Sequence, residues 1–109
     1  YPAPKALGVV RQKGKRLLVR VRCPAAWLGC DKLLVSVHGA GKGAKRLLGK
    51  RRVARVGGGR KKVVSVRLRG SARRYLARLE RKPRVRVTLR TAERLEPTIV
   101  ARPLKRPKP

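Results

Sequence analysis

Two segments of the chain alternate apolar and basic residues: residues 16–23 (RLLVRVRC) and residues 84–90 (RVRVTLR). Successive side chains of a β-strand point to opposite faces of a sheet, so this period of two predicts strands with one buried and one exposed face. The side chains expected to point inward are Leu17, Val19, Val21, Cys23, Val85, Val87 and Leu89. Those expected to point outward are Arg16, Arg20, Arg22, Arg84, Arg86 and Arg90.

Further strands are predicted between these two. In residues 63–68 we expect Val64, Val66 and Leu68 inside, with Val63, Ser65 and Arg67 outside, and in residues 32–38 we expect Leu33, Val35 and Val37 inside. Weaker strand signals cover residues 7–11, 50–56 and 98–102, and turn-forming segments lie at 12–14, 39–43 and 57–59. About seven short strands joined by such turns predict an all-β fold, an antiparallel β-sandwich.

One segment, residues 71–81, has helical rather than strand periodicity. Ser71 can cap a helix N-terminus, Tyr75, Leu76 and Leu79 form an apolar stripe at helical spacing, and Pro83 ends the pattern. We interpret the stripe as part of the core rather than as a binding surface. The helix should join the strand that ends near Arg69 to the strand that begins at Arg84.

The length of the chain, 109 residues, fits a single domain. We assign residues 1–5 to an extended N-terminal segment, 6–102 to the sandwich and 103–109 to a Pro/Lys-rich tail. No apolar run approaches the roughly 20 residues that span a bilayer. The sequence contains no Met, which predicts that a segment preceded Tyr1. A cleaved secretory leader is the interpretation we favour, and an excised fragment is the alternative.

The two cysteines, Cys23 and Cys30, bracket a short loop that contains Pro24 and Gly29. An even number of cysteines in a small exported domain predicts a disulfide. A structural zinc site needs four ligands, and His38 alone could join this pair, while a redox pair has the spacing Cys-x-x-Cys. We therefore expect a disulfide, no metal site and a secreted or cell-surface protein.

The order of these segments resembles a known family. A strand ending in Cys-Pro, a loop closing on Gly-Cys and a Leu-Leu-Val-Ser-Val strand come first. A Gly-rich hairpin, a Val-rich strand, a helix of Ala-Arg-Arg-Tyr-Leu type and a Val-Arg-Val strand follow. This pattern, over about residues 6–102, is similar to the immunoglobulin-like β-sandwich modules of exported proteins of high-GC Gram-positive bacteria. The resemblance implies an immunoglobulin-like sandwich, export, and a structural or adhesive role without a shared catalytic site.

Basic residues dominate the charge of the chain, with 33 Lys and Arg against 4 acids and a formal net charge of +29. They are spread from Lys5 to Lys108 and interleaved with Val and Leu, so they belong to the folded body. Such self-repulsion predicts a polyanionic partner, and a surface that is merely soluble and highly charged is the alternative.

Duplex DNA, bound through phosphates without sequence specificity, is the partner we expect. The few aromatic residues, Tyr1, Trp27 and Tyr75, argue against single strands, which are usually stacked on such rings. Wall teichoic polymers, acidic polysaccharides and anionic lipid surfaces are alternatives. The candidate binding residues are Arg16, Arg20, Arg22, Lys42, Lys45, Arg60, Lys61, Arg67, Arg84, Arg86 and Arg90.

Residues suited to catalysis are few, so we expect no enzyme and no cofactor. The acids Asp31, Glu80, Glu93 and Glu96 are scattered, His38 is the only histidine, and Ser36, Ser65 and Ser71 lack an activating context. The Gly-rich segment 39–45 lacks the spacing of a nucleotide-hydrolysis loop, although Lys42 and Lys45 could contact a phosphate.

A structural role is the second class of hypothesis. Residues 98–101 could form an exposed edge strand or a donated strand, through which copies would polymerise into a filament. The simpler interpretation is an ordinary last strand in its own sheet. The two roles are compatible, because DNA would neutralise the repulsion between subunits and align them as a repeated extracellular coat.

Overall fold

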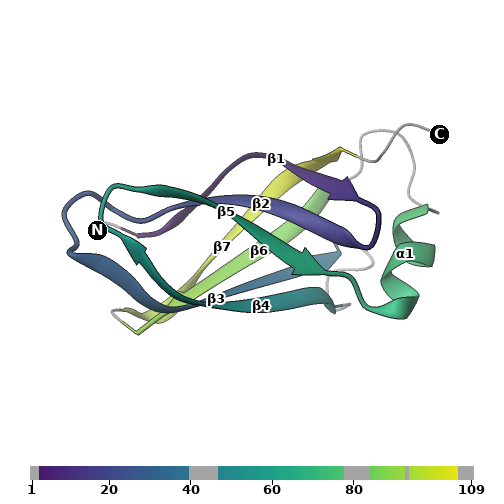
Figure 1. Cartoon of the computed structure of the whole chain (residues 1–109). Helices are drawn as coiled ribbons and strands as arrows, with labels where there is room; N and C mark the ends of the chain where they lie inside the picture. Colours follow the sequence, from purple (N-terminus) through teal and green to yellow (C-terminus); the bar gives the residue numbers. More distant parts are fainter. Residues whose placement is uncertain (1–2, 40–46, 78–83, 93, 106–109) are drawn as a thin grey trace.

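The structure, a computed structural model, describes residues 3–39, 47–77, 84–92 and 94–105. In these ranges the chain forms seven strands and one helix, as predicted (Figure 1). In chain order they are β1 (Lys5–Lys13), β2 (Arg16–Arg22), β3 (Gly29–Gly39), β4 (Leu47–Gly57), β5 (Lys61–Arg67), α1 (Gly70–Ala77), β6 (Arg84–Thr91) and β7 (Arg94–Lys105). Among the described residues, no helix is long and apolar enough to span a membrane.

The seven strands form one sheet in the order β4-β3-β6-β7-β1-β2-β5. All neighbours are antiparallel except β1 and β7, which pair in parallel. The sheet folds over so that β1, β2 and β5 form one layer and β3, β4 and β6 the other, with β7 between them (Figure 1). The two layers therefore share one core.

The free edges of this sheet, β4 and β5, approach each other and nearly close it into a barrel. The backbone N–H of Arg69, just beyond β5, donates to the Leu48 carbonyl of β4 at 2.9 Å. The Arg51 guanidinium of β4 donates to the Ser65 carbonyl of β5 at 3.1 Å. The predicted all-β fold is thus confirmed, but the layers are joined on one side and almost joined on the other, whereas the sequence predicted two separate sheets.

The predicted inward rows form the core. Leu17, Val19, Val21, Cys23, Leu33, Val35, Val37, Val64, Val66, Leu68, Val85, Val87 and Leu89 are all buried. The arginines predicted to point outward from β2, β5 and β6 are all exposed. Alternation thus determined which face of each strand is buried, because a one-residue shift would have turned every apolar side chain to solvent.

Helix α1 begins one residue before the predicted Ser71, and its last described residue is Ala77. Leu76 is buried and Tyr75 packs against the core, which confirms that this part of the apolar stripe belongs to the core. Leu79 and Pro83 lie outside the described residues. The helix lies at one end of the molecule, between β5 and β6 in the chain, as expected (Figure 1).

The last strand is longer than the predicted 98–102. Strand β7 continues to Lys105, where Leu104 is buried and pairs in parallel with Val10 of β1. The Arg102 guanidinium donates to the Ala6 carbonyl at 2.9 Å. The segment after residue 102, predicted to be a tail, therefore begins with residues that complete the core. The apolar residue after Pro103 was the signal that could have predicted this.

Candidate polyanion-binding surface

The outward side of the layer β1–β2–β5 carries two transverse rows of cations. Lys5 of β1 lies opposite Arg22 of β2, which lies opposite Lys61 of β5. At the other end of the strands, Lys13, Arg16 and Arg67 are aligned in the same way. All six side chains are exposed. We call this outward surface the β2 face.

The two rows are separated by six residues along β2, from Arg16 to Arg22, or about 20 Å at 3.3 Å per residue. Over that distance a DNA duplex carries roughly a dozen phosphate charges. The rows can therefore contact separate groups of phosphates on one duplex. Each row spans three neighbouring strands, so it is held by the backbone hydrogen bonds of the sheet.

Between the rows the β2 face is partly apolar. The pairing of β1 with β2 shifts between Leu7 and Arg11, at a segment where Gly8 has a φ of +62°. A hollow of about 350 Å³ lies beside this irregularity, lined by Val9, Arg11, Leu18, Arg20 and Val63. Arg11 and Arg20 thus add two guanidinium groups between the rows, beside apolar side chains.

The described acids lie away from the β2 face. Asp31 belongs to β3, where it forms an ion pair with Arg55 of β4 at 3.6 Å, and Glu96 belongs to β7. The described cations of the β2 face therefore have no carboxylate on their own face to neutralise them. Their field adds up over the surface and favours a polyanion.

Arg84, Arg86 and Arg90 lie on a different surface. They point outward from β6, whose neighbours are β3 and β7, and β7 and β1 stand between β6 and β2 in the sheet. The outward surface of β4, β3 and β6, which we call the β6 face, lies across the core from the β2 face (Figure 1). The structure therefore separates the two arginine sets that the sequence analysis grouped together.

Of the remaining predicted residues, Arg60 belongs to the described part of the chain. Arg60 is exposed and follows the turn at Gly58 and Gly59, directly before Lys61 of the β2 face, so it adds an exposed cation just before β5. Lys42 and Lys45 lie outside the described residues. Three further cations of the β2 face, all on β1, were not predicted from the sequence: Lys5, Arg11 and Lys13. Their alternation is weak because Gly8 interrupts it, but their proximity to the residue 16–22 strand across a short turn was a usable signal.

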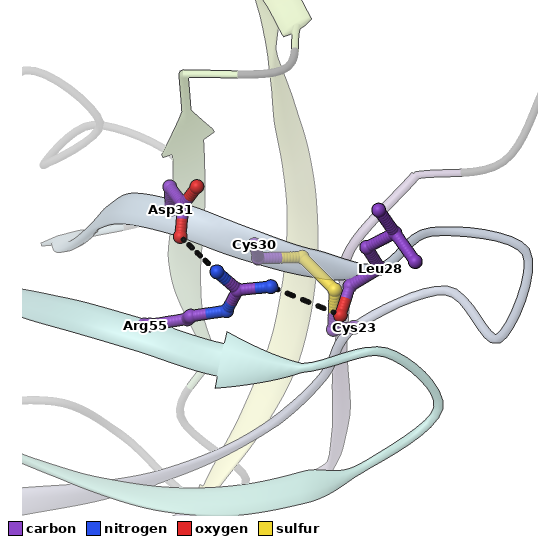
Figure 2. The surroundings of a disulfide bond; sticks show 5 residues. All are labelled: Cys23, Leu28, Cys30, Asp31 and Arg55. Atoms are coloured by element: carbon purple, nitrogen blue, oxygen red, sulfur yellow. Dashed lines mark hydrogen bonds and ion pairs between the residues drawn. A yellow bond between two sulfur atoms is a disulfide. The ribbon is translucent and has the colours of Figure 1, made fainter.

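The predicted disulfide is present. Cys23 and Cys30 are bonded, with their Cα atoms 5.9 Å apart, and both residues are buried. The bond joins the end of β2 to the start of β3 beside Arg55, which also donates to the Leu28 carbonyl at 3.3 Å (Figure 2). The loop that carries Trp27 and Leu28 is thereby fixed at one end of the molecule.

Of the described residues weighed for catalysis, Ser36 and His38 are half-buried on the same side of β3, whereas Ser65 lies on β5 and Ser71 is exposed at the start of α1. Glu80 and Glu93 lie outside the described residues. In the described ranges no group of three or more His, Cys, Asp or Glu residues could hold a metal ion. Comparison with protein-family models and with curated proteins finds no match.

Proposed function

We propose that this protein is a secreted, non-enzymatic binder of duplex DNA that contacts phosphates and does not read the base sequence. The observation that carries the proposal is the pair of cation rows on the β2 face, three strands wide and free of described acids. A flat sheet surface with arginines and lysines at strand spacing matches phosphates generally, and phosphate contacts carry no sequence information directly.

The rows also set the expected strength of the salt dependence. Six phosphate contacts would release condensed counterions, which gives a log–log slope of affinity against salt of about −5. Scrambling the DNA sequence should change the affinity little. Single strands of equal length should bind less well, because the described aromatic residues offer no row of rings on which bases could stack.

The test compares two triple variants that remove equal charge from opposite faces. Arg16→Gln/Arg22→Gln/Arg67→Gln, three residues of the cation rows, should flatten the salt slope by about 3, close to 1 for each lost contact. The control, Arg84→Gln/Arg86→Gln/Arg90→Gln, should leave the slope of the unmodified protein nearly unchanged. Affinities for random duplex, single strand and an acidic polysaccharide are measured across a salt series. Weak duplex binding at low salt, or a clear preference for the polysaccharide, contradicts the proposal and favours an anionic wall polymer.

We further infer an immunoglobulin-like sandwich of an exported protein. The neighbours β7-β6-β3-β4 follow the order G-F-C-C′ of such domains, and β1-β2-β5 follow the order A-B-E. The disulfide supports export, since such bonds persist in oxidising compartments. Both inferences agree with the family resemblance of the sequence. Two free thiols in freshly secreted protein, determined by mass after alkylation, would argue against export.

A repeated coat on DNA is the assembly we favour over strand donation. Residues 98–101 pair with β6 along their length, and the same strand continues to Leu104 and Lys105, which pair with β1, so this segment belongs to the molecule's own sheet. Copies would instead lie side by side on a duplex that neutralises their charge. Electron microscopy of the complex on long duplex should then show regularly spaced particles, whereas filaments without DNA would support strand addition.

A further inference from the structure

The loop between β2 and β3 carries no charge, in a chain where 34% of residues are charged. Residues 24–28, which we call the apolar tip, read Pro-Ala-Ala-Trp-Leu. Ala25, Ala26 and Leu28 are exposed, whereas Trp27 is half-buried and packs against the core. Leu28 is 93% exposed, the highest value among the exposed large hydrophobic residues described. The tip lies at the end of the molecule opposite α1 (Figure 1).

The disulfide and hydrogen bonds to its backbone hold the apolar tip in this exposed position. The disulfide closes its base, and the Trp27 N–H donates to the Pro24 carbonyl at 3.1 Å. The Leu28 carbonyl accepts from the Gly58 N–H at 3.2 Å and from Arg55 at 3.3 Å, while the Leu28 side chain points away from both Arg55 and Asp31 (Figure 2). Its carbonyl is therefore satisfied inside the protein and needs no water, which lowers the cost of moving it into an apolar medium.

Cations surround the apolar tip. They stand at or near the ends of the strands that meet this loop, all are exposed, and we call them the cationic collar: Lys5, Arg22, Lys32, Arg55, Arg60 and Lys61. One of these cations, Arg55, forms an ion pair with Asp31. The tip is the loop beyond the ends of β2 and β3 at this end of the molecule, so its apolar side chains lie beyond the charges at those strand ends (Figure 1).

We propose that the apolar tip inserts into an anionic lipid bilayer while the cationic collar binds the lipid phosphates. An inserted loop meets acyl chains beyond the headgroup plane and phosphates around its base, which is the order of tip and collar here. The exposed Leu28 side chain can enter the acyl region, and each basic residue near an anionic surface adds attraction. A duplex fits this end less well, because its phosphates would meet the uncharged tip before they reached the collar.

Trp27 is the only tryptophan, so its fluorescence reports this loop alone. The protein is mixed with vesicles of equal parts phosphatidylcholine and phosphatidylglycerol, with bromine atoms on the acyl chains as a quencher. We expect strong quenching of Trp27 by these vesicles and little by vesicles of brominated phosphatidylcholine alone. Binding without quenching would overturn the proposal, since the protein would then sit on the headgroups by charge only.

Two pairs of variants distinguish insertion of the apolar tip from general electrostatic attraction to the vesicles. Leu28→Ser should weaken partition into the anionic vesicles by about tenfold or more, whereas Ile99→Ser, a 56% exposed residue of β7, should not. Arg60→Gln/Lys61→Gln in the collar should weaken partition more than Arg84→Gln/Arg86→Gln, which lie near the other end of the sheet. Because Leu28 is exposed, its variant should fold normally, which a thermal melt verifies.

The outcome is independent of the proposed DNA function. Retained DNA binding with failed vesicle insertion would overturn this inference alone, and the reverse result would overturn the proposed function alone. If Leu28→Ser weakens duplex binding as strongly as vesicle partition, the tip is a wedge that enters the DNA, and the membrane proposal is wrong.

Discussion

At the scale of single residues, Gly58 shows how closely the loops of this molecule are packed. A Cβ at position 58 would overlap the carbonyl oxygen of Trp27, so the turn after β4 can cross the apolar tip only where a side chain is missing. We predict that Gly58→Ala lowers the free energy of unfolding by about 1–3 kcal/mol, the usual cost of overpacking. Denaturant unfolding measures it.

The matched control is Gly70→Ala at the start of α1. A Cβ there would have no heavy atom within 4 Å, so the free energy of unfolding should stay within about 0.5 kcal/mol of the original value. An equal loss in both variants would show that the cost at Gly58 does not come from the close approach to Trp27.

The disulfide is a second residue-scale feature with a measurable effect. Cys23 and Cys30 are seven positions apart, so their bond closes a short loop and removes a modest amount of entropy from the unfolded chain. We predict that Cys23→Ala/Cys30→Ala lowers the free energy of unfolding by about 2 kcal/mol, or slightly more because both side chains are buried. Unchanged stability on reduction of the original protein would contradict this prediction.

At the scale of elements, adjacent leucines of β2 test the strand register. Leu17 is fully buried in the core, whereas Leu18 points outward into the hollow of the β2 face. Leu17→Ala should therefore cost about 2–5 kcal/mol of stability, and Leu18→Ala less than about 1 kcal/mol. Unfolding by urea compares the two variants. A larger loss for Leu18→Ala would mean that the faces of β2 are assigned in reverse.

The period of two explains why the inward-pointing side chains of each strand could be predicted, whereas the neighbouring strands in the sheet could not. Alternation fixes which side chains of one strand share a face, and the predicted arginines of β2 and β6 are indeed exposed. It carries no information on which strands pair over long separations, so Arg20 and Arg86 were grouped although β7 and β1 lie between their strands. The candidate cations were thus predicted as exposed residues, while their division between two faces required the structure.

At the scale of the whole molecule, the near closure of the sheet was also not predicted from the sequence. It depends on backbone contacts between β4 and β5, where Gly49 lies so close to the Arg67 carbonyl that a Cβ would overlap it. The buried pattern of β4 is irregular, with Leu48 and Gly49 both buried, so period-two reasoning located the strand but not its second neighbour. Such contacts arise from the twist of the complete sheet.

The net charge of +29 leads to a prediction for the whole molecule. The protein extends over 41 × 24 × 22 Å, and the Debye length falls from about 30 Å at 0.01 M salt to about 8 Å at 0.15 M. At low salt most of the charges therefore repel one another, and the compact state is destabilised. We predict that the Tm of the free protein rises as sodium chloride is increased across this range.

The same salt should have the opposite effect on the complex. Duplex DNA stabilises the folded protein by binding it, so adding DNA should raise the Tm most at low salt, and this increment should shrink as salt weakens the phosphate contacts. Scanning calorimetry with and without random duplex measures both trends, and sodium sulfate at equal ionic strength separates screening from binding of a particular anion. A Tm of the free protein that does not change with salt would show that its cations do not strain the fold. The net charge would then not require a polyanionic partner, whatever the affinity for DNA.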